Sequence, residues 1–110
     1  MTPTKKVVLV TTTQAAAPIV ANRFISFDGK QAKAAAPVLG VSPRDADKGD
    51  TMGVECVGIV LVEAGGAVAA GAKVASDANG CAVVGETQAA GYAVTAATAA
   101  GDVIAVLLKG

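Results

Sequence analysis

The chain has 110 residues, a formal net charge of zero at pH 7 and no histidine. This length fits one domain, the balanced charge argues against a nucleic-acid partner, which would need a basic face, and the commonest general base and metal ligand is missing. Alanine dominates the apolar composition and aromatic residues make up only 3%. Because burying alanine removes little apolar area from water, such a core would gain from a partner or a second copy.

The N-terminus combines a short polar tail with a strand. Residues 1–4 are polar and contain Pro3, whereas residues 5–13 are rich in Val, Leu and Thr, which predicts a strand. Both faces of that run are apolar or small, unlike a strand with one solvated face. The apolar patch Val7–Val10 is too short for the core of a signal peptide, so no cleaved leader is expected.

The rest of the chain reads as a series of strands joined by tight turns. Asp28-Gly29 and Asn79-Gly80 are hairpin signals. The longest strand-like run follows Gly49-Asp50 and contains Gly53 and Gly58, which mark bulges or bends. Residues 31–36 fit either a short strand or an alanine-rich turn. The other strands are expected over residues 19–27, 38–42, 72–76, 81–85, 92–95 and 103–108.

Two short segments fit single helical turns. In residues 42–49, Ser42 would be the N-cap, Pro43 the first helical position and Gly49 the residue after the C-cap. Residues 95–101 repeat the arrangement, with Thr95 as the cap.

One sequence pattern occurs twice in the chain. Gly49-Asp50 and Gly101-Asp102 each open an apolar strand, 52 residues apart (101 − 49). This repeated pattern predicts two similar halves, about residues 22–58 and 72–110. We therefore expect an all-β, mainly β fold: a small β-barrel or sandwich built from two similar halves, with short helical turns. Residues 1–18 would form an N-terminal arm and first strand, and residues 19–110 a single β domain.

No catalytic constellation is apparent, so an enzyme, a cofactor and a bound metal are not expected. The acids fall at turns, where Asp serves backbone geometry, and Asp45–Asp50 lacks the closing Glu of a calcium loop. Cys56 and Cys81 form no CxxC motif, which favours two buried thiols, although a disulfide stays open. The apolar run Val57–Val62 is too short to span a membrane.

A series of short stretches resembles the small capsid-decoration, or cement, proteins of tailed bacteriophages. These stretches are Leu39-Gly40-Val41, the Asp-rich turn 45–50, residues 52–62, Ala70-Gly71-Ala72-Lys73-Val74, residues 77–80 and residues 101–108. The resemblance implies a structural virion protein on the outer surface of a phage capsid that stabilises the head shell. Its partners would be the major capsid protein and copies of itself, as a trimer or a dimer, and it would be made in the host cytoplasm.

Two sets of residues are candidates for these contacts. The resemblance implies a capsid-binding N-terminal arm, which here would be Met1, Thr2, Pro3, Thr4, Lys5 and Lys6. One barrel interior takes only one face of the strand that contains Gly58, so the other face should be covered by a neighbouring subunit or by another segment of the chain. The oligomer interface is expected at Val57, Ile59, Val60, Leu61 and Val62.

Two alternatives stay open. Residues 5–13 could be a strand of the barrel itself or could add to the sheet edge of a partner. The chain could also be a carrier or regulatory module of the biotinyl or lipoyl type, with Lys30 or Lys73 modified, although neither lysine has a neighbouring Met.

Overall fold

A computed structural model describes residues 3–108 and shows an all-β fold, as the sequence predicts. That part of the chain contains no helix. Its eight strands are β1 (Lys6–Gln14), β2 (Arg23–Ile25), β3 (Gly40–Ser42), β4 (Thr51–Glu63), β5 (Lys73–Ser76), β6 (Ala82–Val84), β7 (Gly91–Ala93) and β8 (Val103–Leu108). The expected strand over residues 103–108 has the predicted bounds, whereas the one over residues 19–27 is reduced to β2 and an isolated bridge at Ile19.

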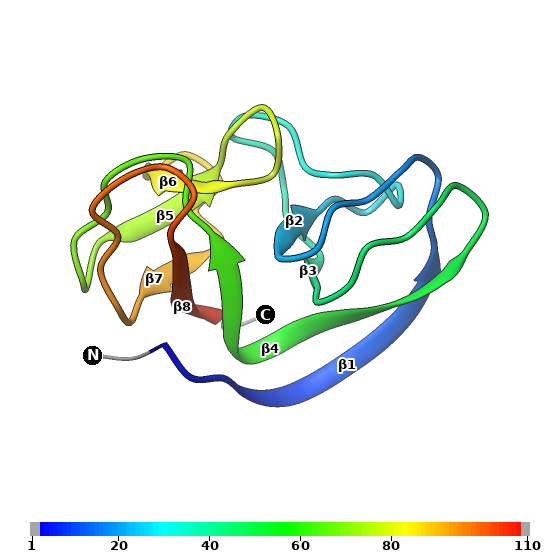
Figure 1. Ribbon diagram of the computed structural model, residues 1–110, viewed down its shortest axis with the longest axis horizontal. Helices are drawn as coiled ribbons and strands as arrows, with labels where there is room; N and C mark the ends of the chain where they lie inside the picture. The colour runs from blue at the N-terminus through cyan, green and yellow to red at the C-terminus, as the bar shows by residue number, and fades with distance from the viewer. Residues whose placement is uncertain (1–2, 109–110) are drawn as a thin grey trace.

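Strand β4 is the centre of the single sheet. The strand order is β2-β3-β4-β8-β7-β5-β6, and β1 also pairs with β4. Gly58 lies opposite both Val7 and Leu108, so β1 occupies one edge of β4 and β8 the other. Figure 1 shows β4 running beside β1 and then turning to lie next to β8. The sheet curls into a small, nearly closed barrel, which the N–H of Phe24 helps to close by donating to the carbonyl of Gly80 (2.7 Å).

The bend in β4 coincides with a glycine, as the sequence predicts. Gly58 has φ +116°, and a Cβ at this position would collide with the carbonyl of Lys6 on β1. Only glycine combines that backbone conformation with so close an approach. The β1–β4 register shifts on either side of Leu9, which accommodates the bend.

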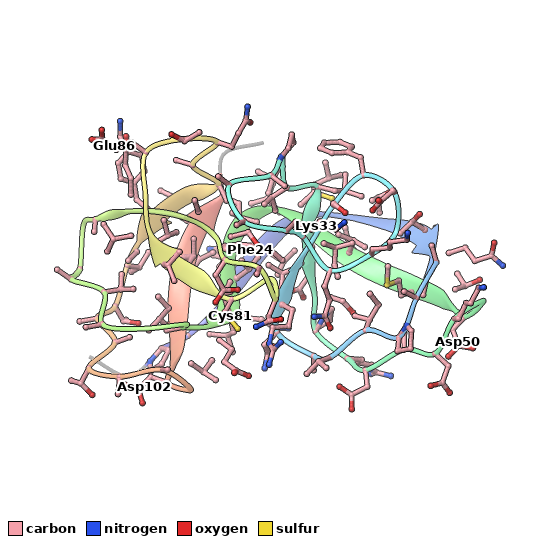
Figure 2. The ribbon with its side chains drawn as sticks, turned by 90° about the horizontal axis from the view of Figure 1, so that it is seen from above. Phe24, Lys33, Asp50, Cys81, Glu86 and Asp102 are labelled. Atoms are coloured by element: carbon pink, nitrogen blue, oxygen red, sulfur yellow. The ribbon has the colours of Figure 1, made fainter. Side chains whose placement is uncertain are left out.

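The core has two unequal parts. The larger cluster combines residues from both halves of the chain: Phe24, Ala32, Val41, Val60, Val62, Ala64, Val68, Val74, Ala82, Ala93, Ala97, Ile104, Val106 and Leu108. The smaller cluster contains Ala15, Ile19, Ile25, Met52, Val54 and Cys56. Phe24 is fully buried and lies near the middle of the molecule, where the two halves meet (Figure 2).

The two predicted helical turns are wrong. Residues 42–49 are extended or turned because Ala46 and Ile19 exchange two backbone hydrogen bonds, of 2.8 and 3.0 Å, across 27 positions of sequence. Ser42 does not cap a helix, since its hydroxyl donates to the carbonyl of Arg44. Thr95 accepts a bond from the N–H of Ala105 on β8 instead. Long-range backbone pairing therefore overrides local capping signals in both segments.

Strand β1 is far more exposed than its composition predicts. Val8 is 74% exposed, Leu9 52% and Val10 55%. The strand lies at an edge of the sheet, where among residues 3–108 it pairs with β4 alone. An apolar run therefore lies on the surface, and the expectation that both of its faces would be covered does not hold within one chain.

Two strand pairs share one register. Residues 10–14 of β1 pair with residues 55–51 of β4, and residues 59–63 of β4 pair with residues 107–103 of β8. The bridge between Ile19 and Ala46 has a counterpart between Val68 and Ala97. Gly49 and Gly101 both have φ +95°. Strand β4 thus contributes residues 51–55 to the first pair and residues 59–63 to the second, and we call residues 6–58 the first half of the molecule and residues 59–108 the second half.

Candidate interaction surfaces

The predicted N-terminal arm contains a residue that is held on the barrel by an ion pair. Lys5 Nζ lies 3.0 Å from Glu55 Oε2 on β4, and Lys6 is the first residue of β1. Pro3 and Thr4 precede this anchor and belong to no strand, while Met1 and Thr2 lie outside the described residues. The structure therefore divides the predicted segment into residues held on the barrel, Lys5 and Lys6, and residues before them.

The five residues predicted for an oligomer interface lie in three different places. Val60 and Val62 are fully buried in the larger core cluster, so their side chains pack within the chain itself. Ile59 and Leu61 are half-buried on the opposite face of β4. Val57 is also half-buried and lines a hollow beside β1.

Ile59 belongs to a row that crosses the outer face of five strands. It lies opposite Lys6 on one side and Leu107 on the other, Leu107 lies opposite Tyr92, and Tyr92 lies opposite Lys73. Residues directly opposite one another in a sheet share a face. The row is therefore a mainly apolar stripe with a lysine at each end.

A second apolar surface lies beside β1. Leu9 and Thr11 of β1 line a hollow of about 380 Å³ together with Phe27, which is 69% exposed. The other lining residues are Val38, Leu39, Cys56, Val57, Ala90 and Leu108. None of these nine residues carries a charge, so the hollow suits an uncharged apolar occupant.

A second hollow, of about 480 Å³, lies over the turn between β3 and β4, and its two acids already accept hydrogen bonds. Asp45 accepts the N–H of Ala21 (2.7 Å), and Asp50 accepts the N–H of Asp47 (2.9 Å). No group of three or more metal-binding side chains occurs among residues 3–108. These carboxylates hold turns, in agreement with the role that the sequence analysis assigns to them.

Cys56 and Cys81 are buried free thiols and form no disulfide. Burial, followed by the negative charge of Asp77, raises the pKa of the Cys81 thiol. Cys81 lies close to the tie between the two halves, where Arg23 Nη2 is 3.2 Å from Glu63 Oε2 and Arg23 Nη1 donates to the carbonyl of Asn79 (3.1 Å). The side chain of Arg23 is 17% exposed and that of Glu63 30%, so the pair is largely shielded from solvent.

The two lysines of the carrier alternative occupy different settings. Lys30 follows the turn after β2, where its carbonyl accepts the N–H of Ser26 (2.9 Å). Lys73 is the first residue of β5 and pairs with Tyr92. Neither lies at the tip of a hairpin between two Met residues, the setting that a carrier lysine usually has.

These features define a class of protein: a small all-β binding or assembly module with two exposed apolar surfaces. No helix in the described residues is long and apolar enough to cross a membrane. A family model described as "Phage cement protein" matches residues 2–108. The chain belongs to this family, and it is a structural, capsid-binding virion protein.

Comparison with solved structures shows the same fold in another phage protein. The crystal structure of the N base of the head fiber gp8.5 of bacteriophage phi29 superposes with a TM-score of 0.75. The two chains are 22% identical, and the match covers 92% of this chain and 93% of that one. No curated protein matches the chain.

The sequence analysis missed Phe27 and the hollow next to it. Phe27 falls at the end of the strand predicted over residues 19–27, but it lies in the turn after β2. The available signal was that Phe27 directly precedes the Asp28-Gly29 turn, where a large apolar side chain is more often exposed. The hollow itself brings together residues from six separate stretches of the chain, so no local sequence pattern identifies it.

Proposed function

We propose that this protein binds the outer surface of a phage head by contacting the major capsid protein, and that it thereby braces the shell. Membership of the phage cement protein family over residues 2–108 carries the proposal. The proposal includes synthesis in the host cytoplasm and a purely structural role without a catalysed reaction.

The capsid contact that we propose is the N-terminal segment from Met1 to Lys6. The ion pair between Lys5 and Glu55 supports this assignment, because it fixes Lys5 to β4, while Pro3 and Thr4 before it belong to no strand. A short segment anchored at one end can reach a neighbouring surface through its main chain, which requires no side-chain motif.

We further propose that the protein is a homo-oligomer, a trimer in preference to a dimer. Of the predicted interface residues, Ile59 and Leu61 remain available on the outer face of β4, and Val57 lies at the hollow. The cross-strand row from Lys6 to Lys73 supplies a stripe that a second subunit could cover.

The test is to delete Met1–Thr4 and to measure two quantities: occupancy on expanded heads and the thermal stability of the free protein. We expect occupancy to fall at least tenfold with an unchanged Tm, because the deletion leaves β1 and the Lys5–Glu55 pair in place. The control is Lys33→Gln in the full-length chain, an exposed lysine outside the proposed contact, which should change neither quantity. Full occupancy after the deletion would move the capsid contact to another surface.

A further inference from the structure

The edge of β1 that faces away from β4 is open. Among residues 3–108, β1 has no pairing partner other than β4. The opening is limited at one end, where the N–H of Ala16 donates to the carbonyl of Gly29 (3.0 Å) and the hairpin tip lies against Gln14. The free part of the edge therefore lies between Lys6 and Thr13.

The phase of the β1–β4 pair shows which backbone groups point outward. The N–H of Ala15 donates to the carbonyl of Asp50 (2.8 Å), which fixes the alternation along the strand. In an antiparallel pair, alternate residues direct both of their backbone groups toward the partner strand. The backbone N–H and C=O groups of Thr11 and Thr13 thus point toward β4. Those of Val10 and Thr12 point to the open edge.

The open edge carries the most exposed apolar run of the molecule. Val8, Leu9 and Val10 are each more than half exposed, and the uncharged hollow lined by Leu9, Thr11 and Phe27 lies beside them. An exposed, apolar strand edge is a template for pairing with another strand, and proteins commonly blunt such edges with charges or proline. No charge and no proline occurs between Val7 and Thr13.

We infer that this edge binds the β1 strand of a second copy, antiparallel and about a two-fold axis that passes between the two Val10 residues. Val10 is the midpoint of β1 (Lys6–Gln14), and its backbone groups point outward. Val8 then lies opposite Thr12 of the second copy, and Leu9 lies opposite Thr11 on the face that carries the hollow. Each Leu9 is thereby brought over the hollow of the other copy.

Charge favours a second copy as the occupant. The hollow is uncharged, and β1 is itself an extended, uncharged, β-branched segment from Val7 to Thr13. Antiparallel pairing about Val10 brings Lys6 closest to Gln14 of the other copy, so no like charges oppose one another. Lys5 is already paired with Glu55. Because the contact is isologous, it satisfies both open edges at once.

This inference rests on the proposed function in one respect: it supplies a second contact between copies, distinct from the outer row and the N-terminal arm. A two-fold contact between subunits can join neighbouring assemblies on a shell, which would tie decorated sites to one another. The pairing itself is a property of the free protein and is measurable without heads.

The decisive variant is Val10→Lys, which places two like charges opposite one another at the two-fold axis. Val10 is 55% exposed, so the fold should be retained. We expect the mass in solution, measured by light scattering at tens of micromolar, to fall by half relative to wild type. The matched control is Val20→Lys, at an exposed valine away from β1 (46% exposed), and it should leave the mass unchanged.

A cross-linking pair tests the register independently. In the proposed pairing the two Val10 residues form a hydrogen-bonded pair with Cα atoms about 5.5 Å apart, within the range that a disulfide spans. Val10→Cys should give a covalent dimer under oxidising conditions at least ten times faster than Thr12→Cys, whose copies lie far apart. Equal rates, or a wild type with the same mass as Val10→Lys, would overturn the inference.

A strand of the shell as the occupant gives a different pattern. Wild type would then be unpaired through β1 in solution, and Val10→Lys would lose only head occupancy, which would also overturn the inference. Failure of the protein to bind heads at all would contradict the proposed function, while the solution mass would still decide the pairing of β1.

Discussion

The two halves of the molecule use the same strand pairing but cover it differently. Thr11 and Val60 occupy the same place in the shared register, opposite Val54 and Val106, and Thr13 and Val62 do so one step further on. In the second half these positions are valines that are fully buried, because Phe24, Ala32 and Val41 from the first half pack into the same cluster. In the first half they are threonines, of which Thr11 is exposed and Thr13 is only half-buried.

The comparison separates pairing from burial. Backbone register and turn geometry are repeated, as the twin φ values of Gly49 and Gly101 show, and they support the proposal that the chain is an internal duplication. The burial of the side chains is not repeated, because it depends on which other segments of the chain cover that face of the sheet. The half that contributes its covering residues to the other is left with its own strand β1 exposed.

The largest effect should come from placing a charge at the two equivalent positions. Val60→Asp buries an unpaired carboxylate in the core and should cost more than about 4 kcal/mol of folding free energy, enough to prevent folding of a small domain. Thr11→Asp adds the same charge at an exposed site and should cost less than about 1 kcal/mol. Urea denaturation of the two variants measures the difference, and equal losses would show that the first half is covered after all.

A second effect should be shared by the halves, since it depends on backbone contact. Gly40 packs against the carbonyl of Glu55, and Gly91 against that of Leu107, so a Cβ at either position would collide with main chain. Gly40→Ala and Gly91→Ala should each cost about 2–4 kcal/mol. Gly66 has open space around its Cα, so Gly66→Ala serves as the control and should change the Tm by little. A loss at only one of the two positions would contradict the equivalence.

Local signals in the sequence predicted the parts of the fold that local chemistry controls. The Asp28-Gly29 and Asn79-Gly80 turns, the glycine bend at Gly58 and the bounds of β8 were all predictable, because each depends on a few adjacent residues. The helical turns failed because Ala46 is held by backbone bonds to Ile19 and Ala97 by backbone bonds to Val68, both far away in the sequence.

The interaction surfaces were harder to predict. The alternation in β4 places Val60 and Ile59 on opposite faces, but a sequence does not state which face another segment covers. For the same reason the exposure of β1 was missed, since Val7–Val10 has the composition of a buried strand. The anchor between Lys5 and Glu55 joins residues 50 positions apart, and no spacing rule identifies such a pair.

The smallest effect concerns the two Gly-Asp turns, which lie at opposite ends of the molecule (Figure 2). Asp102 accepts bonds from the N–H and the hydroxyl of Thr98 and from the N–H of Ala99, whereas Asp50 accepts the N–H of Asp47. Asp102→Asn should therefore lower the Tm at pH 7 more than Asp50→Asn does.

The bonds from Thr98 hold the pKa of Asp102 below its ordinary value. Its stabilising effect is present above the ordinary pKa of an aspartate and is lost as the pH falls through the depressed pKa of the folded state. The Tm difference between wild type and Asp102→Asn should thus shrink between pH 7 and pH 2, as measured by thermal melts. A difference that stays constant with pH would show that the charge of Asp102 has no part in the effect.

The double use of β4 has a consequence for the order in which the chain acquires structure. Neither half can complete its sheet without this strand, and β4 reaches its last partner only when β8, at the far end of the chain, is in place. Pairings between segments so distant in sequence slow folding, because the loop entropy is lost before the contacts form. The two halves should therefore gain and lose structure in one cooperative transition, and a nascent chain should stay protease-sensitive until residue 108 has left the ribosome.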